Sequence, residues 1–239
     1  MIKNIFFMFI VLTFISPKAL YSKIYSKKEI FKSEIKLASL LKEYGHYKNS
    51  LKYYKELTKS NHSVSLFIDL GILYKKIGEI SKAENIIKNA IKEKPNNQEL
   101  INALGDIYFE EENYIKARIY LLKIKNNKRA INRLALIENR KNNYRNAIKY
   151  YNVLVNKYHD ELQRVNLAIL YQKINELEKA EHELVVFYKN SKDKYYATKY
   201  LIRFYKKYNE KEKLKEFLKS LNLKKKKKKK MRPLLKSRR

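Results

Sequence analysis

Apolar and polar residues follow one another along Val64–Asn97 with the spacing of two short helices. Apolar side chains recur three and four residues apart, first at Leu66, Phe67, Leu70, Leu73, Tyr74 and Ile77, and then at Ala83, Ile86, Ile87, Ala90 and Ile91. This spacing places them on one face of an α-helix. Gly78 separates the two stripes, and Pro95 ends the second because it disfavours helical backbone at the residue before it. The segment predicts a helix hairpin.

The same pattern recurs along most of the chain. Repeats begin at Phe31, Val64, Gln98, Lys128, Glu161 and Lys194. The seventh position reads Leu37, Leu70, Leu104, Leu134, Leu167 and Tyr200, the eighth Ala38, Gly71, Gly105, Ala135, Ala168 and Leu201, and the twentieth Ser50, Ala83, Ala117, Ala147, Ala180 and Lys213. Small residues at the last two positions let paired helices approach closely. A period in the low thirties predicts an all-α solenoid of about six antiparallel helix hairpins over residues 31–223.

The repeats resemble those of the tetratricopeptide repeat family, whose pattern is Leu-Gly-x-x-Tyr, then Ala, then Pro. Leu70-Gly71-Ile72-Leu73-Tyr74 and Leu104-Gly105-Asp106-Ile107-Tyr108 carry the match, and Leu167-Ala168-Ile169-Leu170-Tyr171 follows it with Ala in place of Gly. The fourth repeat departs with Glu138 at the Tyr position, and the sixth is degenerate, as terminal repeats often are. The resemblance implies a right-handed superhelix. Taken together with the N-terminal pattern described below, it suggests an exported bacterial member of the family.

Composition limits the chemistry. The 239 residues include no Cys, which excludes disulfides, thiol catalysis and Cys-ligated metals. The formal net charge of +31 would ordinarily predict a nucleic-acid partner. However, eleven of the Lys and Arg residues lie after residue 223. The other basic residues are spread along the chain among many Asn, Ile and Tyr residues. Lys, Asn, Ile and Tyr all have AT-rich codons. An AT-rich genome can supply this charge without selection for a nucleic-acid partner. Nucleic-acid binding is therefore kept only as an alternative function.

The first 22 residues have the pattern of a secretory signal peptide. A basic start is followed by the apolar run Ile5–Ile15 and then by small residues, with cleavage expected after Ala19 or Ser22. Eleven residues, of which only Thr13 is polar, are short for a membrane span, which needs about 20. A retained anchor and a buried first helix are the alternatives. Residues 23–30 form a basic connector to the repeats.

The chain ends in a polybasic tail over residues 224–239. It opens with Lys224, Lys225, Lys226, Lys227, Lys228, Lys229 and Lys230. Like charges and scarce apolar surface predict disorder. Three interpretations stand side by side: a contact to an anionic membrane surface, a solvated end, and a frameshift product of a homopolymeric tract.

Catalytic motifs are missing from the sequence. The four His residues form no metal-type pair with each other, or with a carboxylate at helical spacing, on a shared inner face. No phosphate-binding, nucleophile-elbow or zinc-protease motif occurs. The acidic run Glu110-Glu111-Glu112 lies at an expected helix end, where solvated acids are common. We therefore expect no enzyme, no metal and no cofactor.

The resemblance also implies where a partner would bind. In the family, positions 2, 5, 9, 12 and 13 of each first helix face a concave groove. In this sequence, the apolar residues at those positions are Ile35, Ile68, Ile72, Leu136, Val165, Ile169 and Ile202. The polar residues at those positions are Asn102, Asp106, Arg129, Asn132, Asn139, Arg140, Gln172 and Lys173. Apolar residues there favour a hydrophobic or helical partner segment, unless they pack on a neighbouring helix or on the N-terminal segment. The Lys/Asn/Arg pattern that clamps acidic chain ends in some relatives is not matched.

Three functional hypotheses follow. The first is a non-enzymatic protein–protein interaction scaffold of a bacterial cell envelope, periplasmic or envelope-associated, that assembles or supports a complex such as a periplasmic motor. The second is a basic helical-repeat nucleic-acid binder. The third is a peripheral membrane tether that acts through the Lys tail.

Overall fold

The computed structural model describes residues 26–222. The predicted signal peptide and the Lys224–Lys230 tail lie outside this range. Within it, every regular element is a helix, as the hydrophobic spacing predicts. The helices are α3 (Lys27–Glu43), α4 (Tyr47–Ser60), α5 (Val64–Lys76), α6 (Ile80–Glu93), α7 (Gln98–Glu110), α8 (Tyr114–Leu121), α9 (Lys128–Arg140), α10 (Tyr144–Tyr158), α11 (Gln163–Lys173), α12 (Leu177–Asn190) and α13 (Lys194–Lys207). Residues 211–222 are also helical.

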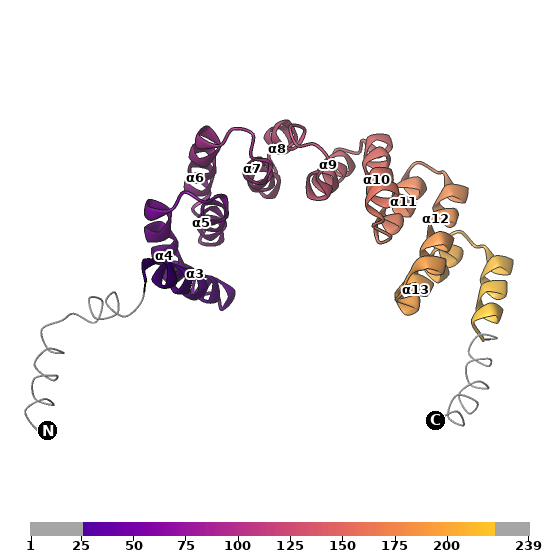
Figure 1. Cartoon of the computed structure of the whole chain (residues 1–239). Coiled ribbons are helices and arrows are strands. Elements are labelled where there is room, and N and C mark those ends of the chain that lie inside the picture. The colour runs from indigo at the N-terminus through magenta and orange to yellow at the C-terminus, as the bar shows by residue number, and fades with distance from the viewer. Residues whose placement is uncertain (1–25, 223–239) are drawn as a thin grey trace, which may run out of the picture. The chain divides into compact units, whose positions relative to one another are not determined.

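The helices pack as sequential antiparallel pairs (Figure 1). α3, α5, α7, α9, α11 and α13 are the first helices of the repeats, and each following helix is a second helix. Each pair contacts the next within a unit through its second helix, for example α4 on α5 and α12 on α13. The all-α repeat solenoid is therefore confirmed.

Side-chain caps fix where several first helices begin. The Ser63 hydroxyl accepts from the Leu66 backbone N–H, and the Asn97 and Asn127 side chains accept likewise from Leu100 and Ala130. Such caps satisfy one of the backbone donors that a helix start leaves unpaired. Ser26 and Glu29 form a reciprocal capping box. α3 accordingly starts at Lys27, inside the segment expected to be a connector.

A left-handed residue closes the turn within each repeat. It is Gly45, Gly78, Glu112, Asn142 and Asn175 in repeats 1–5, always at the fifteenth position. In the last repeat it is Asn209, which is the sixteenth residue counted from Lys194. The sixth repeat is therefore in register from Tyr195, one residue later than the sequence pattern predicts.

Contacts between repeats support this register. Tyr108 donates to Glu84 at 2.6 Å, and Tyr205 donates to Glu181 at 3.1 Å. Glu84 and Glu181 occupy the same repeat position, and Tyr205 becomes equivalent to Tyr108 only when the sixth repeat begins at Tyr195.

Small residues allow close approach within the pairs. Ala38, Ala83, Ala117, Ala135, Ala147, Ala168 and Ala180 are fully buried. A Cβ added to Gly105 would lie 2.7 Å from Leu121 Cδ2, and one added to Gly71 would lie 3.0 Å from Ile87 Cδ1. Gly105 is therefore the position where helices approach too closely for any side chain without a shift of the neighbour.

The described chain divides into two compact units. The N-terminal unit comprises described residues 26–125 and the C-terminal unit residues 126–222. The division follows α8, which has only 8 residues whereas α6 and α12 have 14 each. The short α8 also accounts for the short spacing between the repeats at Gln98 and Lys128. In each unit the first helices form one layer and the second helices another (Figure 1).

Candidate partner-binding surface

The groove residues expected in the N-terminal unit are largely covered. Ile35, Ile68 and Ile72 are half-buried. Asn102 and Asp106 are only 6% and 4% exposed, which differs from the expectation that they line an open groove. The reason is that α7 is buried at nine of its thirteen residues and contacts α5, α6 and α8. This part of the surface therefore offers a partner little beyond the three isoleucines.

The expected residues of the C-terminal unit are more open. Arg129, Arg140 and Lys173 are exposed, and Asn132 and Leu136 are half-buried. Lys173 Nζ donates to Asn139 Oδ1 at 3.2 Å and lies 4.6 Å from the Tyr144 ring centroid, so it links α11 to the α9–α10 pair.

Val165 and Ile169 lie on α11 but differ in exposure. Val165 is 6% exposed because it packs with Phe187 and Ala197, so little of its side chain is accessible to a partner. Ile169 is 40% exposed. Of the two, Ile169 is the apolar side chain that a partner would meet first.

A pocket opens between α11 and α13. Its volume is about 340 Å³, and its lining residues are Val165, Ala168, Ile169, Gln172, Leu184, Tyr200, Arg203, Phe204 and Lys207. This lies at the lower end of ligand-pocket sizes, roughly 300–1,000 Å³. The floor is apolar, and the only charged residues in the lining are the cations Arg203 and Lys207. The pocket would suit a ligand segment that has a large apolar side chain and, next to it, a negatively charged side chain.

The corrected register places those two cations at groove positions. Counted from Tyr195, Lys199, Arg203, Lys206 and Lys207 occupy positions 5, 9, 12 and 13, while Ile202 moves to position 8. Their spacing places the four on one face of α13, and all four are exposed. We refer to them as the basic stripe.

The sequence pattern does not reveal the basic stripe, because the degenerate sixth repeat aligns one residue early. Two signals would have found it: Tyr205 at the position of Tyr74, Tyr108 and Tyr171, and Asn209 as the turn residue. The contact from Lys207 Nζ to Gln172 Oε1, at 3.2 Å, repeats the contact from Lys173 to Asn139 one repeat earlier.

No acidic side chain among the described residues neutralises the positive charges of the basic stripe. None of its four residues forms an ion pair with a described residue, and the acceptor of Lys207 is a neutral amide. In the N-terminal unit, by contrast, Lys75 is paired with Glu110 at 2.6 Å. Cations in the last turn of a helix are favoured by the helix dipole, which accounts for Lys206 and Lys207 but not for Lys199 and Arg203.

Tyr200 adds an aromatic edge without adding charge. Its hydroxyl lies 2.8 Å from that of Tyr196, and the two rings meet edge to face. The hydrogen bond with Tyr196, together with burial, raises the pKa of the Tyr200 phenol. Since this phenol stays neutral at physiological pH, the charge of the pocket is purely positive.

Residues 26–222 contain no group of three or more His, Asp or Glu side chains placed to hold a metal ion. Over the same residues, no helix combines the length and the apolar character that crossing a membrane requires.

Comparisons with known proteins agree with this architecture. The family model for the fourth ARM domain of tetratricopeptide repeat protein 21 matches residues 36–142. A structure described as the functional characterization of Pseudomonas aeruginosa pilF is similar with a TM-score of 0.63 and 17% identity, covering 84% of this chain and 93% of that one. The chain has the tetratricopeptide-repeat fold.

Two further tetratricopeptide-type structures are similar. A tetratricopeptide repeat protein from Parabacteroides merdae ATCC 43184 has a TM-score of 0.57 and 21% identity, covering 84% of this chain and 88% of that one. MamA from Desulfovibrio magneticus RS-1 has a TM-score of 0.57 and 16% identity, covering 68% and 97%. No curated protein sequence matches the chain. At these identities the likeness shows the fold alone, and folds of this kind commonly mediate protein–protein interaction.

Proposed function

We propose that the protein is a non-enzymatic scaffold that binds a segment of a partner protein along its first helices. The main support for this proposal is the pocket between α11 and α13. Its lining is mostly apolar, and it includes the exposed side chain of Ile169. Exposed apolar surface with a polar rim is typical of protein–protein contact sites. The missing catalytic motifs in the sequence support the same conclusion.

We place this scaffold in the cell envelope of a bacterium, in or next to the periplasm. The support comes from the sequence of residues 1–22, which has the charged start, apolar run and small residues of a signal peptide. The complex it serves would be an envelope assembly such as a periplasmic motor. Cell fractionation tests the location: recovery of the native protein from the cytoplasm would contradict it.

One observation favours a second candidate function. The basic stripe and the net charge of +31 are features of nucleic-acid binders. Affinity for RNA that falls steeply with salt would support that alternative. The apolar pocket directly beside the stripe instead favours a protein, because phosphate backbones gain nothing from Ile169. A third candidate, a membrane tether, depends on Lys224–Lys230, and unchanged vesicle binding after deletion of residues 224–239 would count against it.

Crosslinking in native cells tests the scaffold proposal. The full chain is treated with an amine-reactive crosslinker and purified, and the crosslinked lysines are mapped by mass spectrometry. We expect envelope proteins joined to Lys75 and Lys173 or their neighbours on first helices. Crosslinks that reach protein only through lysines of second helices, or that reach only nucleic-acid-binding proteins, would contradict the proposal.

A further inference from the structure

The C-terminal unit places an apolar surface and an uncompensated positive surface side by side. α11 contributes Ile169 and Ala168 to the pocket, and α13 contributes Arg203 and Lys207 to its rim. The basic stripe extends this positive edge to Lys199 and Lys206 on the same helix face. A single partner segment lying in the pocket would therefore meet an apolar wall on one side and cations on the other.

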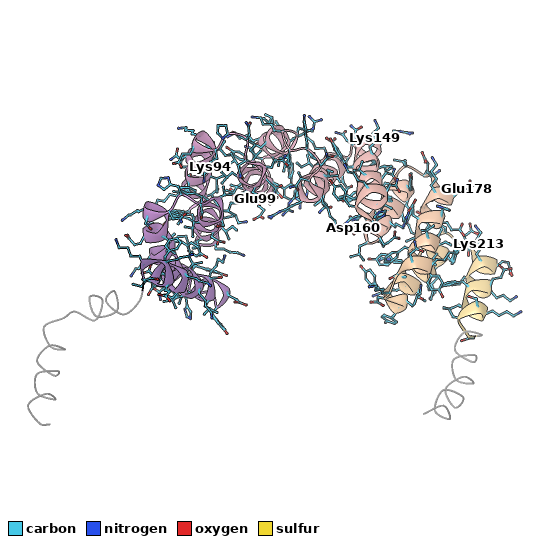
Figure 2. All side chains as sticks on the ribbon, viewed as in Figure 1. Lys94, Glu99, Lys149, Asp160, Glu178 and Lys213 are labelled. Carbon is cyan, nitrogen blue, oxygen red and sulfur yellow. The ribbon has the colours of Figure 1, made fainter. Side chains whose placement is uncertain are left out.

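The lack of internal partners is informative because this chain pairs comparable cations elsewhere. Arg164, also in the C-terminal unit, is held by Glu161 and Glu183 at 2.7 Å each. Lys213, on the helix after α13 (Figure 2), is paired with Glu181 at 2.6 Å. Arg203 has no such partner among the described residues, although it lies against an apolar floor where a carboxylate would interact more strongly than in open water.

We propose that the α11–α13 pocket binds an acidic amphipathic segment of a partner protein, whose apolar side chain enters beside Ile169 while its carboxylates face Arg203 and Lys207. This proposal rests on the scaffold function and names the chemistry of its partner. Arg203 and Lys207 are four residues apart and therefore neighbours on the helix surface. Two acidic residues three or four apart on a helical partner would match that spacing. The carboxylates come from side chains, so the binding does not require a free chain end.

Complementary charge also explains how such a segment would be selected. Opposite potentials speed the encounter and exclude partners of like charge, while the apolar contact slows dissociation. In a protein with a net charge of +31, a basic partner would be repelled throughout. The pocket volume of about 340 Å³ accommodates a single large side chain, so the segment needs one dominant apolar anchor.

Peptide selection tests this chemistry. A displayed library of random 16-residue peptides is selected on the full-length protein in 150 mM salt, and enriched peptides are synthesised with both ends blocked. We expect enriched sequences to combine Asp or Glu with Leu, Ile or Phe at helical spacing. No enrichment, or enrichment without an excess of acids, would overturn the proposal. Tighter binding of a 20-nucleotide single-stranded RNA, or of vesicles containing phosphatidylglycerol, than of any peptide would overturn it as well.

Matched variants assign the binding to the pocket. Arg203→Glu with Lys207→Glu should weaken the selected acidic peptides by about tenfold or more, since two favourable charges become unfavourable. The control is Lys149→Glu with Lys189→Glu, which changes the net charge equally through exposed lysines on α10 and α12; Lys149 is labelled in Figure 2. The control should change affinity less than about twofold, because exposed charges away from the site are screened by salt. Equal loss in both variants would show attraction to the general charge and overturn the proposal.

The apolar half of the proposal has its own variant. Ile169→Ser keeps the charges of the pocket and removes its exposed apolar side chain. This variant should bind the same peptides several-fold more weakly. Peptides in which Gln replaces every Glu, and Asn every Asp, should bind about tenfold more weakly to the unchanged protein. If instead native partners crosslink at Lys75 on α5 and the selected peptides ignore Arg203, this inference fails while the scaffold function stands. If no protein crosslinks to any first helix, the scaffold function fails.

Discussion

The first-helix pairs α5–α7 and α11–α13 are built from the same repeat pattern but present different surfaces. α5 contacts α7 directly, and the groove positions of α7 are buried at Asn102 and Asp106. Between α11 and α13 a pocket remains, with Ile169 exposed and the basic stripe along its edge. The comparison shows that the repeat pattern determines the framework, whereas the residues at groove positions determine whether a surface is left for a partner.

Loss of a framework leucine should have the largest effect and should affect both regions alike. Leu104 on α7 and Leu167 on α11 occupy the seventh position and are fully buried. Leu104→Ala and Leu167→Ala should each reduce the free energy of unfolding by about 2–5 kcal/mol, through lost burial and the cavity left behind. Urea unfolding followed by circular dichroism measures this. Leu37→Ala is the control: Leu37 is 41% exposed, so its loss should cost less than about 1 kcal/mol. If Leu37→Ala cost as much as the two buried variants, burial of the leucine would not determine its contribution to stability. If Leu104→Ala and Leu167→Ala differed widely, the two regions would not share one framework.

Overfilling the closest helix contacts should come next. Gly71→Leu and Ala117→Leu add bulk where a Cβ at Gly71 would already lie 3.0 Å from Ile87 and where Ala117 is fully buried. Each should cost about 1–3 kcal/mol or more, because neighbouring side chains must leave their preferred rotamers. An unchanged thermal midpoint in both variants would show that the repeat register is misassigned.

Exchanging glycine and alanine at the eighth position should sharpen the difference between the regions. Gly105→Ala should destabilise α7 by about 1 kcal/mol, because the clash with Leu121 exceeds the gain in helix propensity. The reverse exchange, Ala168→Gly in α11, should cost about 1–2 kcal/mol, through lower helix propensity and the loss of a buried methyl group. Urea unfolding measures both. A stabilising Gly105→Ala would contradict the close approach of α7 and α8.

Groove residues should give the smallest effects on stability. Ile169→Ser should lower the free energy of unfolding by less than about 1 kcal/mol, since 40% of the residue is exposed and only its buried part loses apolar contact. Ile72→Ser removes a half-buried side chain from α5 and should cost about 1 kcal/mol. The same denaturation experiment compares them. A larger cost at Ile169 than at Ile72 would mean that Ile169 is a packing residue and not a contact surface.

The framework could be predicted from the sequence because it depends on short-range spacing. The leucines and small residues at fixed offsets indicate the hairpins, and the structure has helices beginning at Val64, Gln98 and Lys128. The caps that start these helices, Ser63, Asn97 and Asn127, are also local signals, although the hydrophobic pattern alone does not reveal them.

The surface could be predicted only in part, because it depends on packing between repeats. Nothing in the local sequence distinguishes Val165, which is closed by Phe187 and Ala197, from Ile169, which is open. The basic stripe cannot be recognised when the degenerate sixth repeat is aligned from Lys194. The left-handed conformation of Asn209 shows that this repeat begins one residue later. Since a shift of one residue turns a helix by about 100°, such an error moves every side chain off the face to which it was assigned.

Site-specific photo-crosslinking tests the central claim most directly, that partners bind on the first helices. A photoreactive amino acid replaces Ile169 on α11 in one variant and Val153 on α10 in another; both residues are exposed apolar positions of the C-terminal unit. After irradiation of living native cells, the account predicts a discrete protein adduct from position 169 and none from position 153. Adducts of equal yield from both positions, or from position 153 alone, would contradict it.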